Sequence, residues 1–270
     1  RLTAGSVEFE AAGGRLGGYL AHLKGEEKRP GVIVIHENRG LNPHIRDVTR
    51  RFAVDGFLPL GVDMLSPLGG TPADEDKARE MIRALDTSET LARLAAAVPY
   101  LAGHPFSNGK VGAAGFCWGG GMANRLAAAG TALAASVAYY GAQLPADQVP
   151  KVTAPLQLHY AGLDERTNAG IAAFEAACAA AAVELRARYD AFNPRALRTL
   201  LANGVQLRPF PQEIARAGLL AADEVYAQTL AGNDAFRQLY PEWKAFRDEQ
   251  VRAFGLAHAR VQAFIHAAVV

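Results

Sequence analysis

The sequence predicts an α/β fold, because short β-rich runs alternate with helical patterns from residue 17 to residue 161. The chain has 270 residues, of which 50% are hydrophobic and 20% charged, an ordinary globular balance that supplies a full core. Alternation of this kind is typical of a parallel sheet whose strands are connected by helices. We therefore expect an open sheet covered by helices over this part of the chain.

Six runs in this region have the composition of strands, and helical patterns lie between them. The expected strands are residues 17–22, 32–36, 57–62, 110–115, 133–140 and 155–160. The expected helices are residues 43–54, 72–102, 119–129 and 169–182. The second helix begins with three acidic residues, Asp74, Glu75 and Asp76, at the end where the helix dipole favours negative charge.

The pattern changes after about residue 185, so we expect the chain to divide there into two domains, residues 1–185 and 186–270. The second domain is expected to be mainly helical, with one strand and two helices at residues 204–210, 211–230 and 234–268. Within it, the Asn193-Pro194 pair is typical of the start of a helix.

Composition and charge exclude several classes of function. The 28 Lys and Arg residues are scattered and nearly balance 27 Asp and Glu, so the net charge of +1 predicts no nucleic-acid partner. Apolar stretches are interrupted by Gly, Pro or charge well before about 18 residues, so we expect no membrane span. The chain starts at Arg1 without the pattern of a signal peptide, which was either removed or never present, and the localisation stays open.

Two cysteines, Cys117 and Cys178, do not make a disulfide framework and lack the spacing of a zinc or redox site, so we expect free thiols. Cys117 lies in a G-x-C-x-G sequence between a buried-type strand and a helix, which is the form of a nucleophile elbow. The thiol then lies at the sheet edge beside the first helical N–H groups, which favour a thiolate and supply an oxyanion amide at Trp118. The alternative is a small buried cysteine at a glycine-rich strand end. Cys178 lies in an alanine-rich helix and is expected to be inert.

Two further segments place polar groups at strand ends. The strand at 32–36 runs into Glu37 and Asn38, and the N–H of Asn38 occupies the usual position of a second oxyanion amide. A carboxylate beside a thiol accepts its proton, so Glu37 is a candidate for this role. The alternative is that Glu37 is a solvent-exposed residue at the end of the strand. Asp164 follows the strand at 155–160, where a triad acid lies in the chain order nucleophile, acid, histidine. A helix cap or turn former is the alternative for Asp164.

Residues from about 6 to 184 resemble the dienelactone hydrolase family, through the segments VIHENRGLNPHIRDVTRR, GFCWGG and HYAGLDER in this order. The resemblance implies an α/β-hydrolase fold with a doubly wound sheet. It also implies hydrolysis of small ester or lactone substrates by a Cys-His-Asp triad, without metal or cofactor. By motif, Cys117 is the nucleophile and Asp164 the acid, Glu37 holds and activates the thiol, and Asn38 and Trp118 supply the oxyanion amides.

The chain departs from this family where the triad histidine should follow. The family's histidine lies about thirty residues after the acid, at the end of one more strand, but this chain has none between His159 and His258. The sheet is therefore expected to be truncated before its last strand, with impaired activity. His258 on an apolar stripe of the last helix is a candidate replacement, or else a histidine at a core boundary, and His266 is a weaker candidate.

Three arginines, Arg39, Arg79 and Arg166, are candidates to bind a substrate carboxylate, although each is equally typical of an exposed or structurally paired position. Residues from about 188 to 264 resemble the C-terminal helical part of the solute-binding proteins of TRAP transporters, through YDAFNPRALRTLLANGVQLRPFPQEI and AADEVYAQTLAGNDAFRQLYPEWKAFRDEQ. This second resemblance implies a fusion and a lean towards the periplasm. A carboxylate-binding fragment or a catalytically dead hydrolase scaffold are the alternative functions, and the oligomeric state is not predicted.

Overall fold

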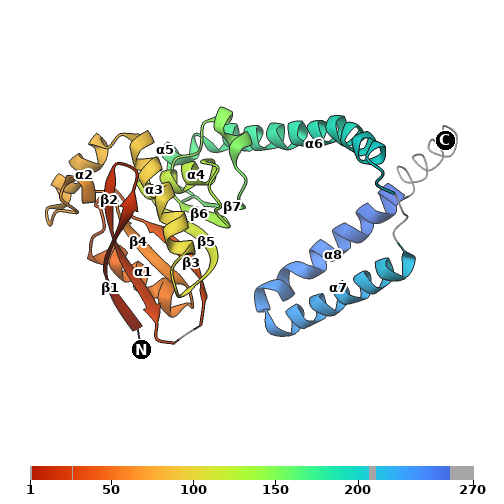
Figure 1. The fold of residues 1–270 in the computed structure, drawn as a ribbon, viewed down its shortest axis with the longest axis horizontal. Coiled ribbons are helices and arrows are strands. Elements are labelled where there is room, and N and C mark those ends of the chain that lie inside the picture. The colour runs from red at the N-terminus through yellow and green to blue at the C-terminus, as the bar shows by residue number, and fades with distance from the viewer. Residues whose placement is uncertain (1, 26, 207–210, 256–270) are drawn as a thin grey trace. The chain divides into compact units, whose positions relative to one another are not determined.

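The computed structural model describes the chain except for residues 1, 26, 207–210 and 256–270 (Figure 1). The chain divides into two compact units, Arg1–Asn193 and Pro194–Val270. The first unit contains a sheet with helices on both faces. The second contains the end of a long helix and a helical hairpin.

The first unit is built on a seven-stranded mixed sheet. Its strands are β1 (Leu2–Ala11), β2 (Gly14–Leu23), β3 (Arg29–Ile35), β4 (Leu58–Asp63), β5 (Ser107–Phe116), β6 (Ala135–Tyr139) and β7 (Leu156–His159). The spatial order is β1-β2-β4-β3-β5-β6-β7. The pairs β1–β2 and β2–β4 are antiparallel, and all pairs from β4 through β3, β5 and β6 to β7 are parallel. The carboxyl ends of β3, β5 and β6 therefore meet at one edge.

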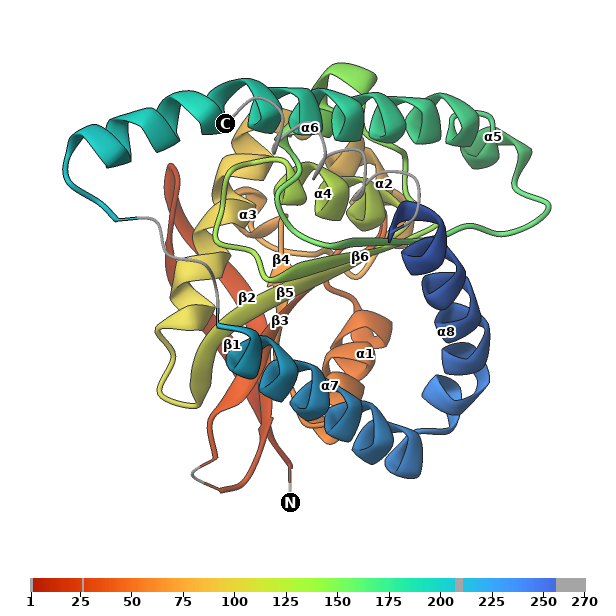
Figure 2. The same ribbon diagram turned by 90° about the vertical axis from the view of Figure 1, so that its right-hand side faces the viewer.

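Helices cover both faces of this sheet. The structure contains α1 (Pro43–Val54), α2 (Glu75–Ala84), α3 (Thr87–Ala102), α4 (Trp118–Ala127), α5 (Glu165–Asn168), α6 (Ile171–Ala202), α7 (Gln212–Gly232), α8 (Asp234–Phe254) and the short 3₁₀ helices η1 (Ser66–Leu68) and η2 (Ala146–Lys151). Helices α3 and α4 pack on one face and α1 packs on the other (Figure 2). The predicted α/β class with a mainly helical C-terminal part is confirmed.

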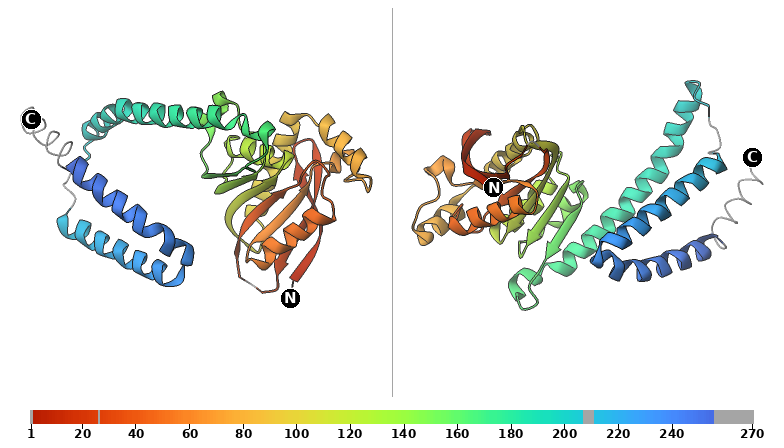
Figure 3. Two further views of the ribbon diagram at one scale, coloured as in Figure 1. Left: turned by 180° about the vertical axis from the view of Figure 1, so that it is seen from behind. Right: turned by 90° about the horizontal axis from the view of Figure 1, so that it is seen from below.

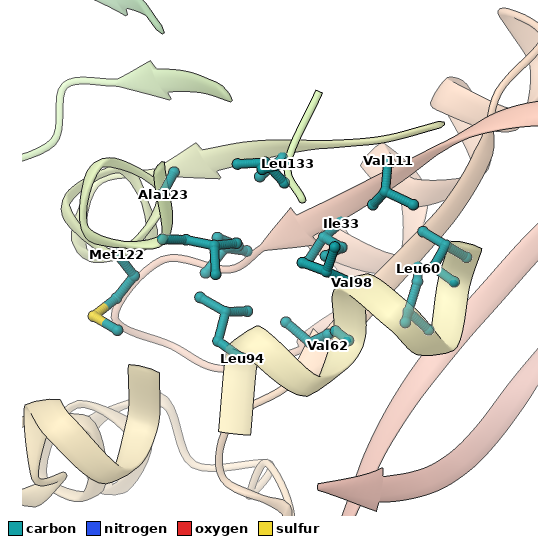
Figure 4. Packing of buried hydrophobic residues seen from close by; sticks show 14 of the residues in the cluster. Ile33, Leu60, Val62, Leu94, Val98, Val111, Met122, Ala123 and Leu133 are labelled. Carbon is teal, nitrogen blue, oxygen red and sulfur yellow. The ribbon is translucent and has the colours of Figure 1, made fainter. Parts of the chain in front are cut away.

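The main core lies between the sheet and the pair α3 and α4. Figure 4 shows Leu94 and Val98 of α3 beside Ile33 of β3, with Leu60 of β4 and Met122 of α4 at opposite ends of the same cluster. Ile33, Leu60 and Leu94 are fully buried. Burial of such a side chain contributes about 1.5–3 kcal/mol. This packing fixes the strand ends that carry the polar residues.

The expected strands and helices are present, with two corrections in the first unit. Strand β1 lies before the first expected strand and forms a hairpin with β2. The expected helix at 72–102 is two helices, α2 and α3. Asp86 lies between them and begins α3 as its N-cap, because its side chain accepts the Glu89 N–H at 2.8 Å.

The helix expected at residues 169–182 is longer than predicted. Helix α6 continues through residues 185–194 to Ala202, with Pro194 inside it (Figure 3). The Asn193-Pro194 pair is therefore not a helix start, because the surrounding Ala, Leu and Arg residues are strong helix formers. The helical stretch Glu165–Ala202 is long and apolar enough to cross a membrane by length and composition, which on its own is weak evidence for a span.

The second unit contains the hairpin of α7 and α8, joined at Asn233, whose side chain caps α8 by accepting the Phe236 N–H at 2.9 Å. Its helices meet through an aromatic cluster centred on Tyr226, which contacts Phe236, Tyr240 and Trp243. The strand expected at 204–210 is not formed in its described part, residues 204–206, and the remainder lies outside the described residues. The last expected helix is described as far as Phe254.

Candidate active site

Cys117 occupies a strained turn between β5 and α4. Its φ of 54° and ψ of −115° lie in a region that residues with a side chain rarely adopt. The Cys117 N–H donates to the carbonyl of Tyr139 at 3.0 Å, and the carbonyl of Cys117 accepts from Gly121 N–H at 3.2 Å. The neighbouring strand and the first turn of α4 thus hold the backbone in this conformation. The thiol is half-buried at the sheet edge, which is the place predicted for it.

Two glycines allow this turn. A Cβ added at Gly115 would lie 2.0 Å from the carbonyl oxygen of Gly119. A Cβ added at Gly119 would lie 2.4 Å from the carbonyl oxygen of His36 and 2.5 Å from that of Ile35. These are backbone atoms of α4 and of the end of β3, so a side chain at either position requires the strand and helix to separate. Glycine at both positions is a steric requirement of the elbow.

His36 ties the end of β3 to the elbow. Its ring is fully buried. The Nε2 atom accepts the Met64 N–H at 3.2 Å, so Nδ1 carries the proton and donates to the carbonyl of Glu37 at 2.7 Å. The ring also stacks on the indole of Trp118, with centroids 5.3 Å apart and planes 13° apart. Burial lowers the pKa of His36, and the neutral ring with one donor and one acceptor fits these two bonds.

Glu37 is bound by a residue that the sequence did not single out. The hydroxyl of Tyr140 donates to Glu37 Oε1 at 2.9 Å. Tyr140 follows β6 and has a φ of 42°, a second strained position at the same sheet edge. Burial raises the pKa of Tyr140, and the hydrogen bond to Glu37 raises it further, so the phenol stays protonated. Its position as the last residue of the strand expected at 133–140 was the only signal in the sequence.

A cavity of about 540 Å³ opens beside the cysteine. Cys117, Trp118, Asn38 and Tyr140 line it together with apolar side chains from α2 and α4. Three arginines also line it: Arg83, Arg125 and Arg166. No histidine and no carboxylate is among the described residues that line it. The cavity is therefore positively charged along its described wall.

Of the three arginines proposed from sequence, the structure places Arg166 at the cavity. Arg39 pairs with Glu75 at 3.2 Å and Arg79 pairs with Asp76, and within the described part of the chain neither lines the cavity. Arg39 and Arg79 therefore lie in ion pairs with neighbouring carboxylates, as in the alternative interpretation of the sequence. Arg83 and Arg125 were missed, because the face that a helix turns to a cavity depends on its packing.

Asp164 caps a short helix. Its carboxylate accepts the Thr167 N–H at 3.1 Å at the start of α5. The hydrogen bonds from Thr167 lower the pKa of Asp164. Asp164 therefore has the helix-cap position that was its alternative role in the sequence analysis. It is not among the described residues that line the cavity.

The remaining candidates lie away from the cysteine or outside the described residues. His258 and His266 fall within residues 256–270, which the structure does not describe. Cys178 lies exposed on α6, and partial burial raises the pKa of its thiol, which disfavours the reactive thiolate.

A sheet of this order, with helices on both faces and a strained elbow at the end of a central strand, defines an α/β hydrolase. The sequence pattern of the dienelactone hydrolase family matches residues 16–190, and the chain belongs to that family. It is 31% identical over 172 residues to the carboxymethylenebutenolidase of Pseudomonas putida, covering 60% of this chain and 72% of that protein. It is also 49% identical over 74 residues to the hydrolase fragment YghX of Escherichia coli, covering 27% of this chain and 63% of that protein.

Solved structures show the same similarity. A dienelactone hydrolase from Anabaena variabilis superposes with a TM-score of 0.52 and 26% identity, covering 65% of this chain and 80% of that one. P91, a dienelactone hydrolase-like promiscuous phosphotriesterase from metagenomic libraries, superposes with a TM-score of 0.56 and 29% identity, covering 66% of this chain and 77% of that one. The first unit is therefore a hydrolase domain.

Proposed function

We propose that this chain hydrolyses carboxylic esters or lactones, with Cys117 as the nucleophile. The observation that carries the proposal is the strained backbone of Cys117 beside a cavity of about 540 Å³. Strain of this kind persists at functional sites, where the surrounding structure holds it. Trp118 begins α4, so its N–H lies among the helical amides that have no partner within the helix.

In the proposed reaction the Cys117 sulfur attacks the carbonyl carbon of the substrate. The N–H groups of Trp118 and Asn38 donate to the oxygen that becomes negatively charged. Glu37 accepts the thiol proton, the bond between the carbonyl carbon and the ester oxygen breaks, and this oxygen takes up the proton. An ester releases its alcohol at this step, whereas an opened lactone stays attached to the sulfur as a thioester and leaves only when the thioester is hydrolysed. The thioester is then hydrolysed by water, which restores the thiol.

The lack of a described histidine at the cavity predicts slow turnover. In proteases, removal of the triad leaves about 10³- to 10⁴-fold acceleration over water, supplied by the oxyanion hole and binding. A free carboxylate is a weak base for a thiol, so the proton transfers limit the rate. We therefore expect added imidazole to accelerate hydrolysis.

Hydrolysis of p-nitrophenyl acetate by the full chain tests this proposal. Cys117→Ala should abolish the enzymatic rate, while Cys178→Ala should leave it unchanged. Imidazole at millimolar concentration should increase the rate of the parent chain over that of Cys117→Ala. Equal rates for the parent chain and Cys117→Ala at every imidazole concentration would remove Cys117 as nucleophile.

Asp164 and His258 are proposed as the remaining members of a triad. His258→Ala should lower the rate only if this histidine supplies the base. Asp164→Asn keeps a side chain that caps helices as well as aspartate does, so a loss of rate in this variant separates an acid role from a cap role. An unchanged rate in both variants would leave Cys117 without these partners.

We further propose that the substrate carries a negative charge, which Arg166 binds. Arg39 and Arg79, which are paired outside the described cavity lining, are proposed to attract this charge more weakly from a distance. Within the described residues, Arg83 and Arg125 at the same cavity form no ion pair, so their charges are available to a ligand. The relatives named carboxymethylenebutenolidase support an acidic substrate. Arg166→Gln should raise the KM of a p-nitrophenyl succinate monoester more than that of the acetate.

The C-terminal residues 186–270 are proposed to derive from a periplasmic solute-binding protein, through fusion to the hydrolase domain. The end of the family match at residue 190 and the division of the chain after Asn193 support a change of origin near this point. Calorimetric titration with small dicarboxylates tests whether this part still binds a ligand. Heat that disappears in Arg166→Gln would assign the binding to the hydrolase cavity instead.

A further inference from the structure

Tyr140 and Cys117 share an unusual backbone feature. Within the described residues they are the two positions other than glycine with a positive φ, 42° and 54°. They follow β6 and β5, which are neighbours in the sheet. One hydrogen bond joins the two turns, from Cys117 N–H to the carbonyl of Tyr139, and another holds Tyr140 N–H to the carbonyl of His159 at 2.8 Å. The strain at Tyr140 is thus maintained by the sheet in the same manner as the strain at the elbow.

The side chain of Tyr140 crosses the end of β5. Its hydroxyl donates to Glu37, which follows β3, and the sheet order is β3-β5-β6. The hydrogen bond therefore connects the strand on one side of the Cys117 strand to the strand on the other side. Tyr140 also lines the cavity with Cys117 and is 37% exposed, so its ring is accessible from solvent.

We propose that Tyr140 is a positioning residue that holds the Glu37 carboxylate over the end of β5, where this carboxylate accepts the proton of the Cys117 thiol. The inference rests on the proposed role of Cys117 as nucleophile. With Oε1 bound by the phenol, Oε2 is the oxygen left to accept a proton. In this step the S–H bond breaks, its electron pair stays on sulfur, and the proton forms an O–H bond on Glu37.

A direct role of Tyr140 as an acid is disfavoured by its surroundings. Loss of the phenol proton would place a phenolate against the Glu37 carboxylate, and like charges at hydrogen-bond distance repel strongly. Burial and Glu37 both raise the pKa of Tyr140, which agrees with a permanent donor. Tyr140 therefore acts through Glu37 and not on the substrate.

The test uses the full chain with Cys178→Ala, so that Cys117 is the one thiol left for alkylation by iodoacetamide. Tyr140→Phe should slow alkylation of Cys117 by about 10-fold or more, the effect of losing one hydrogen bond to a charged group. Tyr139→Phe is the matched control, because it removes the neighbouring hydroxyl, for which the structure gives no hydrogen bond, and should leave the rate unchanged.

A second variant keeps the test decisive. Glu37→Gln should slow alkylation as much as Tyr140→Phe does. The double variant should be no slower than Glu37→Gln alone, because both changes remove the same interaction, the Glu37 carboxylate positioned by Tyr140. In ester hydrolysis, Tyr140→Phe should lower kcat with little change in KM. A Tyr140→Phe variant with unchanged alkylation, or losses that multiply in the double variant, would overturn the inference.

The two proposals fail in different ways. If the parent chain does not hydrolyse esters, the proposed function fails, while the alkylation rates still report whether Tyr140 and Glu37 act on the thiol. If hydrolysis depends on Cys117 but not on Tyr140, the function stands and this inference is wrong. Circular dichroism of each variant confirms that the fold is retained, and the Glu37→Gln comparison applies even if Tyr140→Phe does not fold.

Discussion

Gly119→Ala should destabilise the hydrolase unit strongly, although alanine is the better helix former. Gly119 lies in the first turn of α4, and an added Cβ would be 2.4 Å and 2.5 Å from two carbonyl oxygens at the end of β3. Real Cβ atoms essentially never come this close to another heavy atom. The oxygens belong to the backbone of a central strand, and one belongs to His36, whose buried ring is held by two hydrogen bonds.

The expected free energy follows from two opposing effects. Overpacking of a rigid site costs about 3 kcal/mol, at the upper end of its usual range. Replacement of glycine by alanine within a helix contributes about 1 kcal/mol in the other direction. We therefore expect Gly119→Ala to lose about 2 kcal/mol of unfolding free energy. Gly121→Ala, two residues later in α4, meets its nearest atom at an ordinary 3.6 Å and should gain about 1 kcal/mol.

Urea unfolding of the full chain measures the difference. The chain has two tryptophans, and a Trp243→Phe background leaves Trp118, at the elbow itself, as the fluorescent reporter of the hydrolase unit. The two variants should differ by about 3 kcal/mol, with Gly119→Ala the less stable. Equal midpoints for Gly119→Ala and Gly121→Ala would refute the close approach of α4 and β3.

Three further predictions concern the same unit. Burial lowers the pKa of His36, so below about pH 6.5 the histidine takes up a proton in the unfolded chain but not in the folded one. The stabilisation should therefore be complete above this pH and decrease as the pH falls. His36→Gln should reduce this pH dependence in urea unfolding midpoints measured from pH 8 to 5. Asn42→Ala removes the cap that accepts the Ile45 N–H at 3.0 Å and should cost about 1 kcal/mol in thermal unfolding, whereas Asn42→Ser should not. Leu94→Ala at a fully buried position should cost about 3 kcal/mol, while Val54→Ala, 63% exposed, should change stability by less than about 0.5 kcal/mol.

The parallel part of the sheet could be predicted from sequence because its strands are buried on both faces. Residues 32–36 and 57–62 are continuous apolar runs, and β3 and β4 are indeed almost wholly buried. Strand β1 was missed because most of its residues are exposed and its pattern does not alternate clearly. The Gly13-Gly14 pair, with positive φ at both residues, was the available signal for its hairpin.

The helix start expected at Asn193-Pro194 was wrong because a local signal was given more weight than the helical composition around it. Proline is favoured in the first turn of a helix, so Asn193-Pro194 suggested a start. Residues on both sides of Pro194 are strong helix formers, and α6 passes through it without a break. The proline therefore did not mark a helix start here, although the division into two compact units falls immediately before it.

The site was predictable where it depends on strand ends and unpredictable where it depends on side-chain directions. Cys117, Glu37 and Asn38 follow strands whose carboxyl ends meet at one edge, so topology alone brings them together. The hydrogen bond from Tyr140 to Glu37 joins residues 103 positions apart in sequence. It accompanies a positive φ at Tyr140 that no local sequence pattern predicts. Arg125 lines the cavity from α4, a helix whose first turn lies close to the end of β3 at Gly119, and this packing could not be predicted from the sequence.

The elbow and the proposed triad partners Asp164 and His258 lie in different parts of the chain. Every residue that holds Cys117, from His36 to Tyr140, precedes β7 in sequence, and so does the main core apart from Leu156, the first residue of β7. A change after β7 therefore leaves the thiol, Glu37, the proposed oxyanion amides and the cavity wall from α2 and α4 in place, while it decides whether a histidine also transfers protons. In this protein the Cys117-dependent rate with imidazole, obtained by subtracting the rate of Cys117→Ala at the same concentration, divided by the Cys117-dependent rate without imidazole, measures how much acceleration a missing histidine would supply.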